Sequence, residues 1–383
     1  MKEKLLIITA SGASIPLGFP SIKKIDELFC ETAKMSPLSK NTNLYEELKR
    51  MFPTSSGNYE KMLYIMRHIS SISYGSTLRD ILQEKFDEDL RNRVGLLRAE
   101  LLTGLFKHFC EKANSIDNPK FNDFKVFLNS LEECFDLSFI TTNHDNIISL
   151  VYPEHITGFD INKPFDAKRL LDSKNWRFNI PLHGSIHFNM KPEQKCLYKI
   201  HWTSIEESKQ QNFMGHSSER TDQYLWRLNI PFIEGGDKLN QMFCEPFFDY
   251  LYKSRELLNE SNRILIIGYG FGDMHLNKLI SDASFENKKI FIIDKKDYPY
   301  GNSCDYEKYD DWIRALSRTI TYNVYEPRVI FKDKQDTPII DANQNITNVE
   351  YSECCIGSNK TRIFYNGLEE AYSIVDEIKK FMF

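Results

Sequence analysis

Short continuous runs of hydrophobic residues occur four times along the chain, and polar or small residues follow each run. Runs of this length and composition are typical of parallel strands that are buried on both faces of a sheet. Ligands of such sheets bind beyond the carboxyl ends of the strands, so we expect the loops after these runs to converge. The four runs are Lys4–Thr9, Leu137–Thr141, Arg263–Ile267 and Lys289–Ile293.

The long segment between the first two predicted strands follows a helical pattern instead. Its apolar residues recur at helical spacing with charged residues between them. We therefore predict an α/β protein whose Rossmann-like parallel sheet is formed by residues 1–20 and 130–300, with a helical insertion over residues 21–129. Lys191–Gln223 is polar and irregular, which predicts a loop or a small subdomain. The predicted helical segments are Lys23–Met35, Tyr59–Ser70, Leu78–Leu101 and Phe121–Cys134.

Residues 301–383 are predicted to form a β-rich C-terminal extension. Thr319–Lys332 and Asn348–Phe364 have the pattern of β-hairpins, and Gly367–Phe383 has the pattern of a closing amphipathic helix. A chain of 383 residues is long for one ordinary domain, which agrees with a division into several parts.

Composition and charge exclude several classes of protein. Hydrophobic residues make up 41% of the chain and charged residues 27%, which is ordinary for a globular protein and excludes general disorder. The net charge is -5 and no long basic run exists, so nothing favours direct contact with nucleic acid. The apolar run Leu5–Ile8 is too short for a signal peptide and no stretch could span a membrane, which favours a cytoplasmic protein.

The eight cysteines do not form a metal-binding pattern. None belongs to a Cys-x-x-Cys pair, and the adjacent residues Cys354 and Cys355 have poor spacing for a chelate. We therefore expect reduced thiols and no metal site.

Three loops carry candidate chemistry. Small residues in Thr9–Ser21 (TASGASIPLGFPS) would let backbone N–H groups approach a pyrophosphate, although a tight strand-to-helix turn fits as well. In TTNHDN, Asn143 and Asp145 can face one ligand while His144 points elsewhere, although both residue types are also common in turns. His183 precedes a glycine and could act as a base near neutral pH, although a lone histidine is more often structural.

Together these loops resemble the motifs of the sirtuin-like, NAD-consuming family: a Gly-Ala-Gly-x-Ser loop, a Thr-x-Asn-x-Asp segment and a His-Gly pair, in this order. Two further segments resemble the bacterial defence branch of that family. Asn58–Met66 (NYEKMLYIM) is similar to its Asn-aromatic-Glu helix. Ile264–Asn277 (ILIIGYGFGDMHLN) is similar to its Gly-Tyr-Ser-Phe-x-Asp-x-His-x-Asn strand and loop, so the resemblance covers roughly residues 4–295.

The resemblance implies a role for each matched residue. Asn143 would hold the nicotinamide ribose and the attacking water, Asp145 would support that geometry, and His183 would be the general base. We add Asp294, which follows a strand and could hydrogen-bond the adenosine ribose, as acidic residues do in other dinucleotide folds. The other cofactor-binding residues would be Ala10, Gly12, Ala13 and Ser14 along the diphosphate, Gly268, Gly270 and Asp273 near the adenosine half, and Pro20, Thr142 and Tyr269.

Two departures from the family's pattern bear on the reaction. Ala10 replaces the first loop glycine and tolerates a positive φ poorly, so the loop must use a different conformation or bind less well. The two Cys-x-x-Cys pairs of the zinc ribbon in protein-deacylating sirtuins are missing, and Gly18–Ser21 replaces their Asp-Phe-Arg. The missing ribbon and the changed loop favour NAD hydrolysis without an acyl-lysine acceptor.

We therefore expect an NAD glycohydrolase that cleaves NAD, its substrate, to nicotinamide and ADP-ribose without a metal, and that depletes NAD in antiphage (abortive infection) defence. One alternative is an NAD-dependent protein deacylase or ADP-ribosyl transferase, and another is a non-catalytic scaffold that senses NAD or ADP-ribose. Because an unregulated NAD hydrolase would be toxic to its own cell, we expect a homo-oligomer controlled by a separate partner. The resemblance suggests a HerA-type hexameric ATPase as that partner, with an Argonaute-like protein as the alternative.

Overall fold

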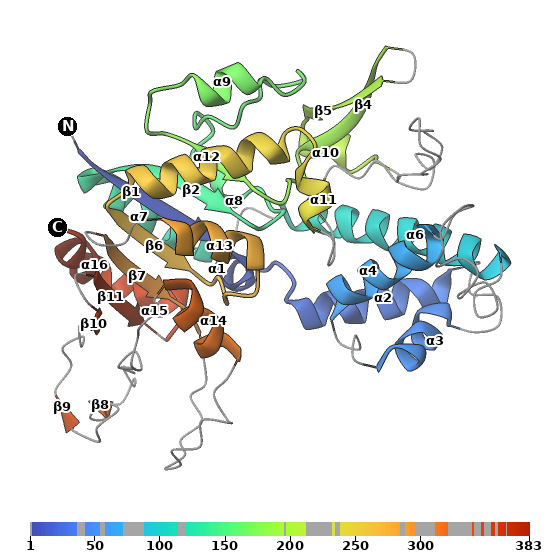
Figure 1. Cartoon of the computed structure of the whole chain (residues 1–383), viewed down its shortest axis with the longest axis horizontal. Coiled ribbons are helices and arrows are strands. Elements are labelled where there is room, and N and C mark those ends of the chain that lie inside the picture. The colour runs from blue at the N-terminus through green and yellow to red at the C-terminus, as the bar shows by residue number, and fades with distance from the viewer. Residues whose placement is uncertain are drawn as a thin grey trace.

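The structure is a computed structural model (Figure 1). It describes residues 2–36, 43–53, 58–71, 88–113, 119–194, 197–211, 232–233, 238–283, 288–295, 311–320, 339–340, 346–347, 354–356, 359–364 and 366–383.

A seven-stranded sheet forms the core, in the order β10-β11-β7-β6-β1-β2-β3. All neighbouring strands pair in parallel except β10 and β11, which are antiparallel. The four predicted strands are confirmed and are adjacent to one another as β7, β6, β1 and β2, so the Rossmann-like α/β class is also confirmed. The parallel strands are β1 (Glu3–Thr9), β2 (Phe135–Thr141), β3 (Asn179–Pro181), β6 (Arg263–Ile267), β7 (Lys289–Ile293) and β11 (Asn359–Phe364).

The sheet separates two hydrophobic layers. Successive side chains of a strand point to opposite faces, so Leu5 and Ile7 of β1 belong to one layer and Leu6 and Ile8 to the other. Helices α7 and α16 cover the first face, and helices α12 and α13 cover the second. Burial on both faces explains why these strands are continuous hydrophobic runs in the sequence. These helices are α7 (Pro119–Cys134), α12 (Phe247–Glu260), α13 (Met274–Asp282) and α16 (Val375–Met382).

The described residues between β1 and α7 are mainly helical, as predicted, and lie to one side of the sheet (Figure 1). Helices α2, α4 and α6 pack against one another, and α3 packs against α2. The side chains of Ser21 and Asn43 cap α2 and α3 by accepting hydrogen bonds from backbone N–H groups. Of the predicted segment Leu78–Leu101, the part from residue 88 is described, and it is helical. These helices are α2 (Ile22–Met35), α3 (Leu44–Met51), α4 (Tyr59–Ser71) and α6 (Glu88–Ala113).

The polar stretch Lys191–Gln223, predicted to be a loop or a small subdomain, has regular structure in its described part. Its first part completes an antiparallel hairpin of β4 and β5, and residues 212–223 lie outside the described residues. Phe188 and Ile200 anchor the hairpin in the second hydrophobic layer, so its outward side chains can be polar and hide the strand pattern. The elements of this part of the chain are α8 (Ile147–Val151), α9 (Ala167–Leu171), β4 (Phe188–Gln194), β5 (Leu197–Trp202), α10 (Ile205–Ser208) and α11 (Lys238–Met242).

The C-terminal region contributes directly to the core sheet. Asn348–Phe364 contains the predicted hairpin, formed by β10 and β11, and β11 pairs with β7. The predicted closing helix over Gly367–Phe383 consists of α15, a 3-10 turn and α16. The remaining elements are β8 (Ile339–Ile340), β9 (Ile346–Thr347), β10 (Cys354–Ile356), α15 (Leu368–Ala371) and the turn η6 (Tyr372–Ile374).

The hairpin predicted over Thr319–Lys332 is wrong at its start. Its first two residues end helix α14 (Asp311–Ile320), and residues 321–332 lie outside the described residues. Leu316 and Ile320, four positions apart, are buried on one side of this helix, and the Thr319 hydroxyl donates to a carbonyl one turn earlier (2.6 Å). Both features favour a helix over a strand.

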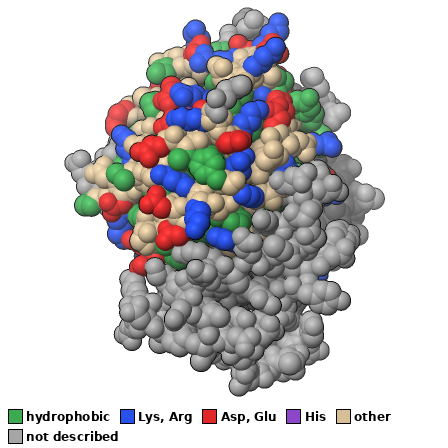
Figure 2. All heavy atoms as spheres, turned by 90° about the vertical axis from the view of Figure 1, so that its left-hand side faces the viewer, with side chains coloured by type: hydrophobic (Ala, Val, Ile, Leu, Met, Phe, Trp, Pro, Cys, Tyr) green, Lys and Arg blue, Asp and Glu red, His purple; other side chains and the backbone are tan. Residues whose placement is uncertain are grey.

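Positive and negative side chains are interspersed on the face of the molecule that Figure 2 shows. No continuous basic area covers its described part, which agrees with the composition. Of the helices that the structure describes, none has the length and apolar character that a membrane crossing requires.

Candidate functional site

The loops after β1 and β6 are in backbone contact at the carboxyl edge of the sheet. The N–H of Gly12 donates to the carbonyl of Gly268 (3.0 Å), and the N–H of Ala10 donates to that of Ile267 (3.1 Å). Gly268 has a φ of 59°, and a Cβ added there would lie 2.3 Å from the carbonyl carbon of Gly12. Position 268 therefore requires glycine both for its conformation and for the close approach of the two loops.

The first loop turns directly into two short helical elements, α1 (Ser11–Ser14) and the 3-10 turn η1 (Ile15–Leu17). Ala10 stands before α1 with a φ of -141°, which is extended backbone that any residue adopts. The loop thus has a conformation that alanine tolerates in place of the family's glycine. Ala13 is buried, and Pro20 is half-buried on the way to α2.

Ser14, Asn143 and Asp145 form a hydrogen-bonded cluster between the loops after β1 and β2. The Ser14 hydroxyl donates to Oδ2 of Asp145 (2.5 Å) and accepts from Nδ2 of Asn143 (2.7 Å). Oδ1 of Asp145 accepts from the N–H of Ile147 (3.0 Å), at the start of α8. Burial raises the pKa of Asp145, although these hydrogen bonds act in the opposite direction.

This cluster sets the orientation of the Asn143 amide. A serine hydroxyl has one proton, and Ser14 donates it to Asp145, so Asn143 must present its NH₂ group to Ser14. Oδ1 of Asn143 is then left to accept a hydrogen bond from a ribose hydroxyl or a water molecule.

His144 points away from the cluster, as the alternation of an extended segment predicts. Its ring packs against Phe232 and Phe109, with 5.1 Å and 6.4 Å between ring centroids. Burial, together with the positive charges of His183 and Lys238, lowers the pKa of His144 to about 3. His144 is therefore neutral at pH 7.

His183 lies in a turn that is tied to the loop after β2. The N–H of Ile186 donates to the carbonyl of His144 (2.7 Å), and Gly184 has a φ of 103°. The His183 side chain is buried, and its Nε2 lies 2.9 Å from Oδ2 of Asp273. The turn thus brings the candidate base to the same edge of the sheet as Asn143.

Asp273 connects three elements through one carboxylate. Oδ1 accepts from two N–H groups in the first turn of α13 (2.9 and 3.0 Å) and so caps this helix. Oδ2 lies 2.9 Å from Nε2 of His183 and 3.0 Å from Nζ of Lys238 on α11. Nζ of Lys238 is also 3.6 Å from Oε2 of Glu60 on α4. Burial raises the pKa of Asp273, but His183 and Lys238 outweigh this effect and hold it well below its usual range.

The other predicted residues lie around these loops. The Tyr269 hydroxyl donates to the carbonyl of Asp273 (2.9 Å) and so supports the loop after β6. Gly270, in the same loop, has a φ of 63°. Thr142 donates its N–H to the last residue of β1 (3.1 Å). Asp294 follows β7, and its carboxylate accepts from the next N–H along the chain (2.8 Å).

Sequence reasoning missed the contact between His183 and Asp273, and it missed Lys238 and its pairing with Glu60, which lies in the Asn-aromatic-Glu motif. The resemblance suggested that Asp273 lies near the adenosine half of NAD, whereas in the structure its carboxylate contacts the candidate base. The sequence does place Asp273 just before the segment that forms α13, and aspartate is a common helix cap in this position. Nothing in the sequence marks Lys238, because only the folded topology brings α11 and α4 to this loop.

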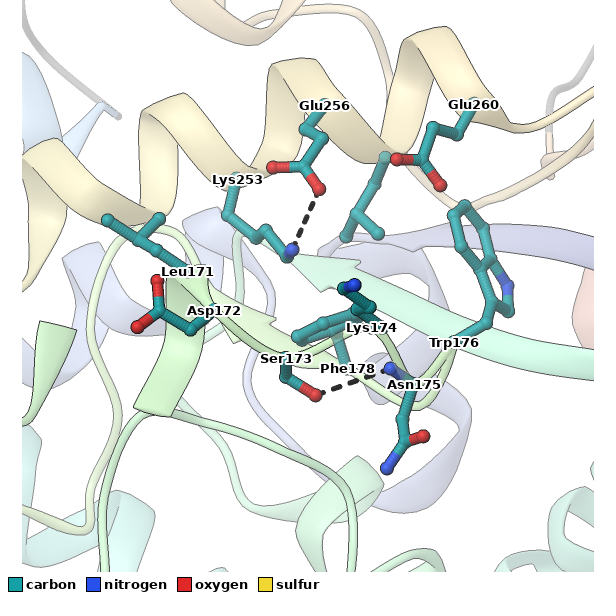
Figure 3. Close-up of a pocket in the computed structure, with 11 residues that line it drawn as sticks. Leu171, Asp172, Ser173, Lys174, Asn175, Trp176, Phe178, Lys253, Glu256 and Glu260 are labelled. Atoms are coloured by element: carbon teal, nitrogen blue, oxygen red, sulfur yellow. Dashed lines mark hydrogen bonds and ion pairs between the residues drawn. The ribbon is translucent and has the colours of Figure 1, made fainter. Parts of the chain in front are cut away.

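A pocket of about 520 Å³ lies at the opposite edge of the sheet (Figure 3). It is lined by residues 171–176, by Phe178 and by side chains of α12 that include Lys253 and Glu260. Lys4, at the start of β1, pairs with Glu260 (2.6 Å) and lies over the ring of Trp176. The candidate chemistry is at the other ends of the strands, so this pocket is not part of the candidate site.

The described residues do not bring three or more His, Cys, Asp or Glu side chains into a group that could hold a metal ion. Four cysteines within this part of the chain are free thiols: Cys30, Cys110, Cys134 and Cys244.

Part of the chain is similar to a known domain family. The SIR2-like domain family matches residues 137–310, a range that contains Asn143, Asp145, His183 and Asp273. Among solved structures, "Structure of Sir2Tm bound to a propionylated peptide" is 12% identical, with 78% of this chain and 84% of that chain covered and a TM-score of 0.34. None of the curated proteins matches the chain. A SIR2-like domain indicates NAD-dependent activity in general.

Proposed function

We propose that the protein is an NAD hydrolase that releases nicotinamide and ADP-ribose. The observation that supports this most strongly is the convergence of an oriented asparagine amide and a buried histidine at the carboxyl edge of the sheet. Both residues lie within the range that the SIR2-like domain family matches.

The reaction suits these two groups. The nicotinamide of NAD is a pyridinium attached to the anomeric carbon of the ribose, and it leaves as a neutral base that needs no proton. Oδ1 of Asn143 would accept a hydrogen bond from the ribose or the water, and Ser14 and Asp145 would hold the amide in place. The water oxygen bonds to the anomeric carbon and the C–N bond breaks, with its electron pair staying on the pyridine nitrogen. The proton of the water passes to His183, which is general base catalysis.

The function is tested by incubating the purified chain with NAD and following nicotinamide and ADP-ribose, with and without an acylated peptide. We expect nicotinamide release at the same rate in both cases. Nicotinamide release that requires the peptide would support the deacylase alternative. NAD binding without any release of nicotinamide would support the scaffold alternative, in which His183 would not act as a base.

Chelation is expected to change nothing. The sequence has no paired cysteines for a zinc ribbon, so treatment with EDTA should leave both the melting temperature and the rate of NAD cleavage unchanged. The measurements are a thermal melt, a nicotinamide assay and elemental analysis of the untreated protein. A stoichiometric, tightly bound zinc would contradict this prediction and favour a deacylase.

We place the activity in antiphage defence, as depletion of cytoplasmic NAD, and we expect control through assembly. Light scattering should detect a homo-oligomer, and a separately encoded partner, such as a HerA-type ATPase or an Argonaute-like protein, should change NAD turnover. The measurement combines light scattering with turnover of the chain alone and with the product of the neighbouring gene. A fully active 45.0 kDa monomer that no partner affects would contradict this expectation.

A further inference from the structure

The carboxylate of Asp273 is held so firmly that it can orient another group. Its Oδ1 is committed to the first turn of α13 by two hydrogen bonds, which fixes the direction of Oδ2. The side chain of Asn277 donates to the carbonyl of Phe271 (2.7 Å), which ties the loop to the same helix. Asp273 cannot rotate away from His183 without losing the cap of α13.

Oδ2 faces the imidazole at a distance of 2.9 Å from Nε2. Nε2 is not aligned for a hydrogen bond with Oδ2, but an unprotonated Nε2 would place its electron pair against the negative carboxylate at this distance, so the contact favours the tautomer with the proton on Nε2. Neutral imidazole has one N–H, and Nδ1 is therefore the nitrogen with a free electron pair. Lys238 and the N–H of Leu276 stabilise the ionised Asp273 whether or not His183 is protonated, and an aspartate normally ionises well below the pH at which a histidine acts as a base.

We propose that Asp273 is the positioning residue of the base His183, and that the Lys238–Glu60 pair sets the charge next to this dyad. The proposal rests on the proposed function, and it identifies Nδ1 as the atom of His183 that accepts the proton. During hydrolysis Nδ1 takes the proton of the attacking water, and the resulting imidazolium faces the Asp273 carboxylate. The dyad works as an orienting carboxylate and an imidazole do in other hydrolases.

Lys238 links this dyad to the helical region between β1 and β2. Its Nζ shares Oδ2 of Asp273 with His183, and Glu60 of α4 holds it from the other side. Among the residues that the structure describes, the charged and titratable groups next to His183 are Asp273 from the loop after β6, the neutral His144 from the loop after β2 and, through Asp273, Lys238 from α11. A displacement of α4 would separate Glu60 from Lys238 and so change the charge near the base, while Lys238 would keep its contact with Asp273.

Two substitutions have opposite expected effects on the pH dependence of kcat/KM. Asp273→Asn keeps a good helix cap but removes the negative charge, so kcat should fall by about 10–100-fold, and the acid limb should move to lower pH. Lys238→Met removes a positive charge, which favours the imidazolium, so the acid limb should move to higher pH. If the two residues only stabilised the fold, their substitutions would not shift the acid limb in opposite directions.

The matched control is Asp282→Asn, at the other end of α13. Asp282 is exposed and pairs only with Lys278 on the same helix (2.6 Å) among the interactions of the described residues. This variant should keep the parental kcat and pH profile. Thermal melts of all three variants show whether each is folded.

A measurement that does not need catalysis reads the tautomer directly. The measurement is NMR of protein with ¹⁵N-labelled histidine rings, and the signals of His183 are assigned by their loss in His183→Gln. The parental protein should carry the His183 proton on Nε2, and Asp273→Asn should lose this preference. A parental His183 with its proton on Nδ1, or Asp273→Asn with the parental kcat, pH profile and tautomer, overturns the proposal. If the parental protein does not hydrolyse NAD, the proposed function fails, and the tautomer alone decides whether Asp273 orients His183.

Discussion

Replacing Asn143 or His183 by alanine is expected to lower the rate of NAD hydrolysis by at least ~100-fold, the scale of losing a positioned acid–base group. Asn143→Ala removes the acceptor that Ser14 and Asp145 orient. His183→Ala removes the group that takes the proton of the water. Initial rates of nicotinamide release at saturating NAD measure both effects.

The fold should survive both substitutions, because these residues follow strands and do not fill the core. The matched control is His187→Ala, four positions after His183. The His187 ring stacks on Trp202 (4.5 Å between ring centroids), and burial lowers its pKa to about 4, so it is a neutral, structural histidine. His187→Ala should retain the parental rate of hydrolysis. If His183→Ala hydrolyses NAD at nearly the parental rate, His183 is not the base.

Gly268→Ala is expected to have the largest effect on stability, with a loss of about 3 kcal/mol in the free energy of unfolding. Two costs combine at this position. The φ of 59° strains any residue with a Cβ, and the new Cβ would lie 2.3 Å from the backbone of Gly12, which cannot move aside as a flexible side chain could. Chemical denaturation measures the loss, and NAD hydrolysis should fall with it, because the loops after β1 and β6 would separate.

The same loop supplies two graded controls. Gly270 has a φ of 63° but nothing within 4 Å of a Cβ, so Gly270→Ala should cost about 1 kcal/mol, from backbone strain alone. Gly272 has neither a positive φ nor a close neighbour, so Gly272→Ala should stay within about 0.5 kcal/mol of the parental protein. Equal stabilities of Gly268→Ala and Gly272→Ala would show that the two loops do not touch as described.

The sequence by itself determined the four central strands of the sheet and the loops that form most of the candidate site. Strands buried on both faces must be continuously apolar, so β1, β2, β6 and β7 could be identified without any structure. The polar loops at their carboxyl ends had to converge once the strands were parallel. For the same reason, the alternation in TTNHDN was enough to separate Asn143 and Asp145 from His144.

Only the tertiary structure decided what depends on contacts between segments that are distant in sequence. Local sequence patterns do not show which side chain faces Nε2 of His183. Asp273 reaches this atom because β6 pairs with β1, which places the loop between β6 and α13 at the carboxyl edge of the sheet. Lys238 and Glu60 come from helices whose positions depend on packing; Lys238 has no local signal, and the Asn-aromatic-Glu motif that contains Glu60 does not show what Glu60 contacts. Tertiary contacts also decided the polar hairpin of β4 and β5, because a strand with one exposed face has no continuous apolar run that would reveal it. They decided the pairing of β11 with β7 as well, because these two strands are far apart in the sequence.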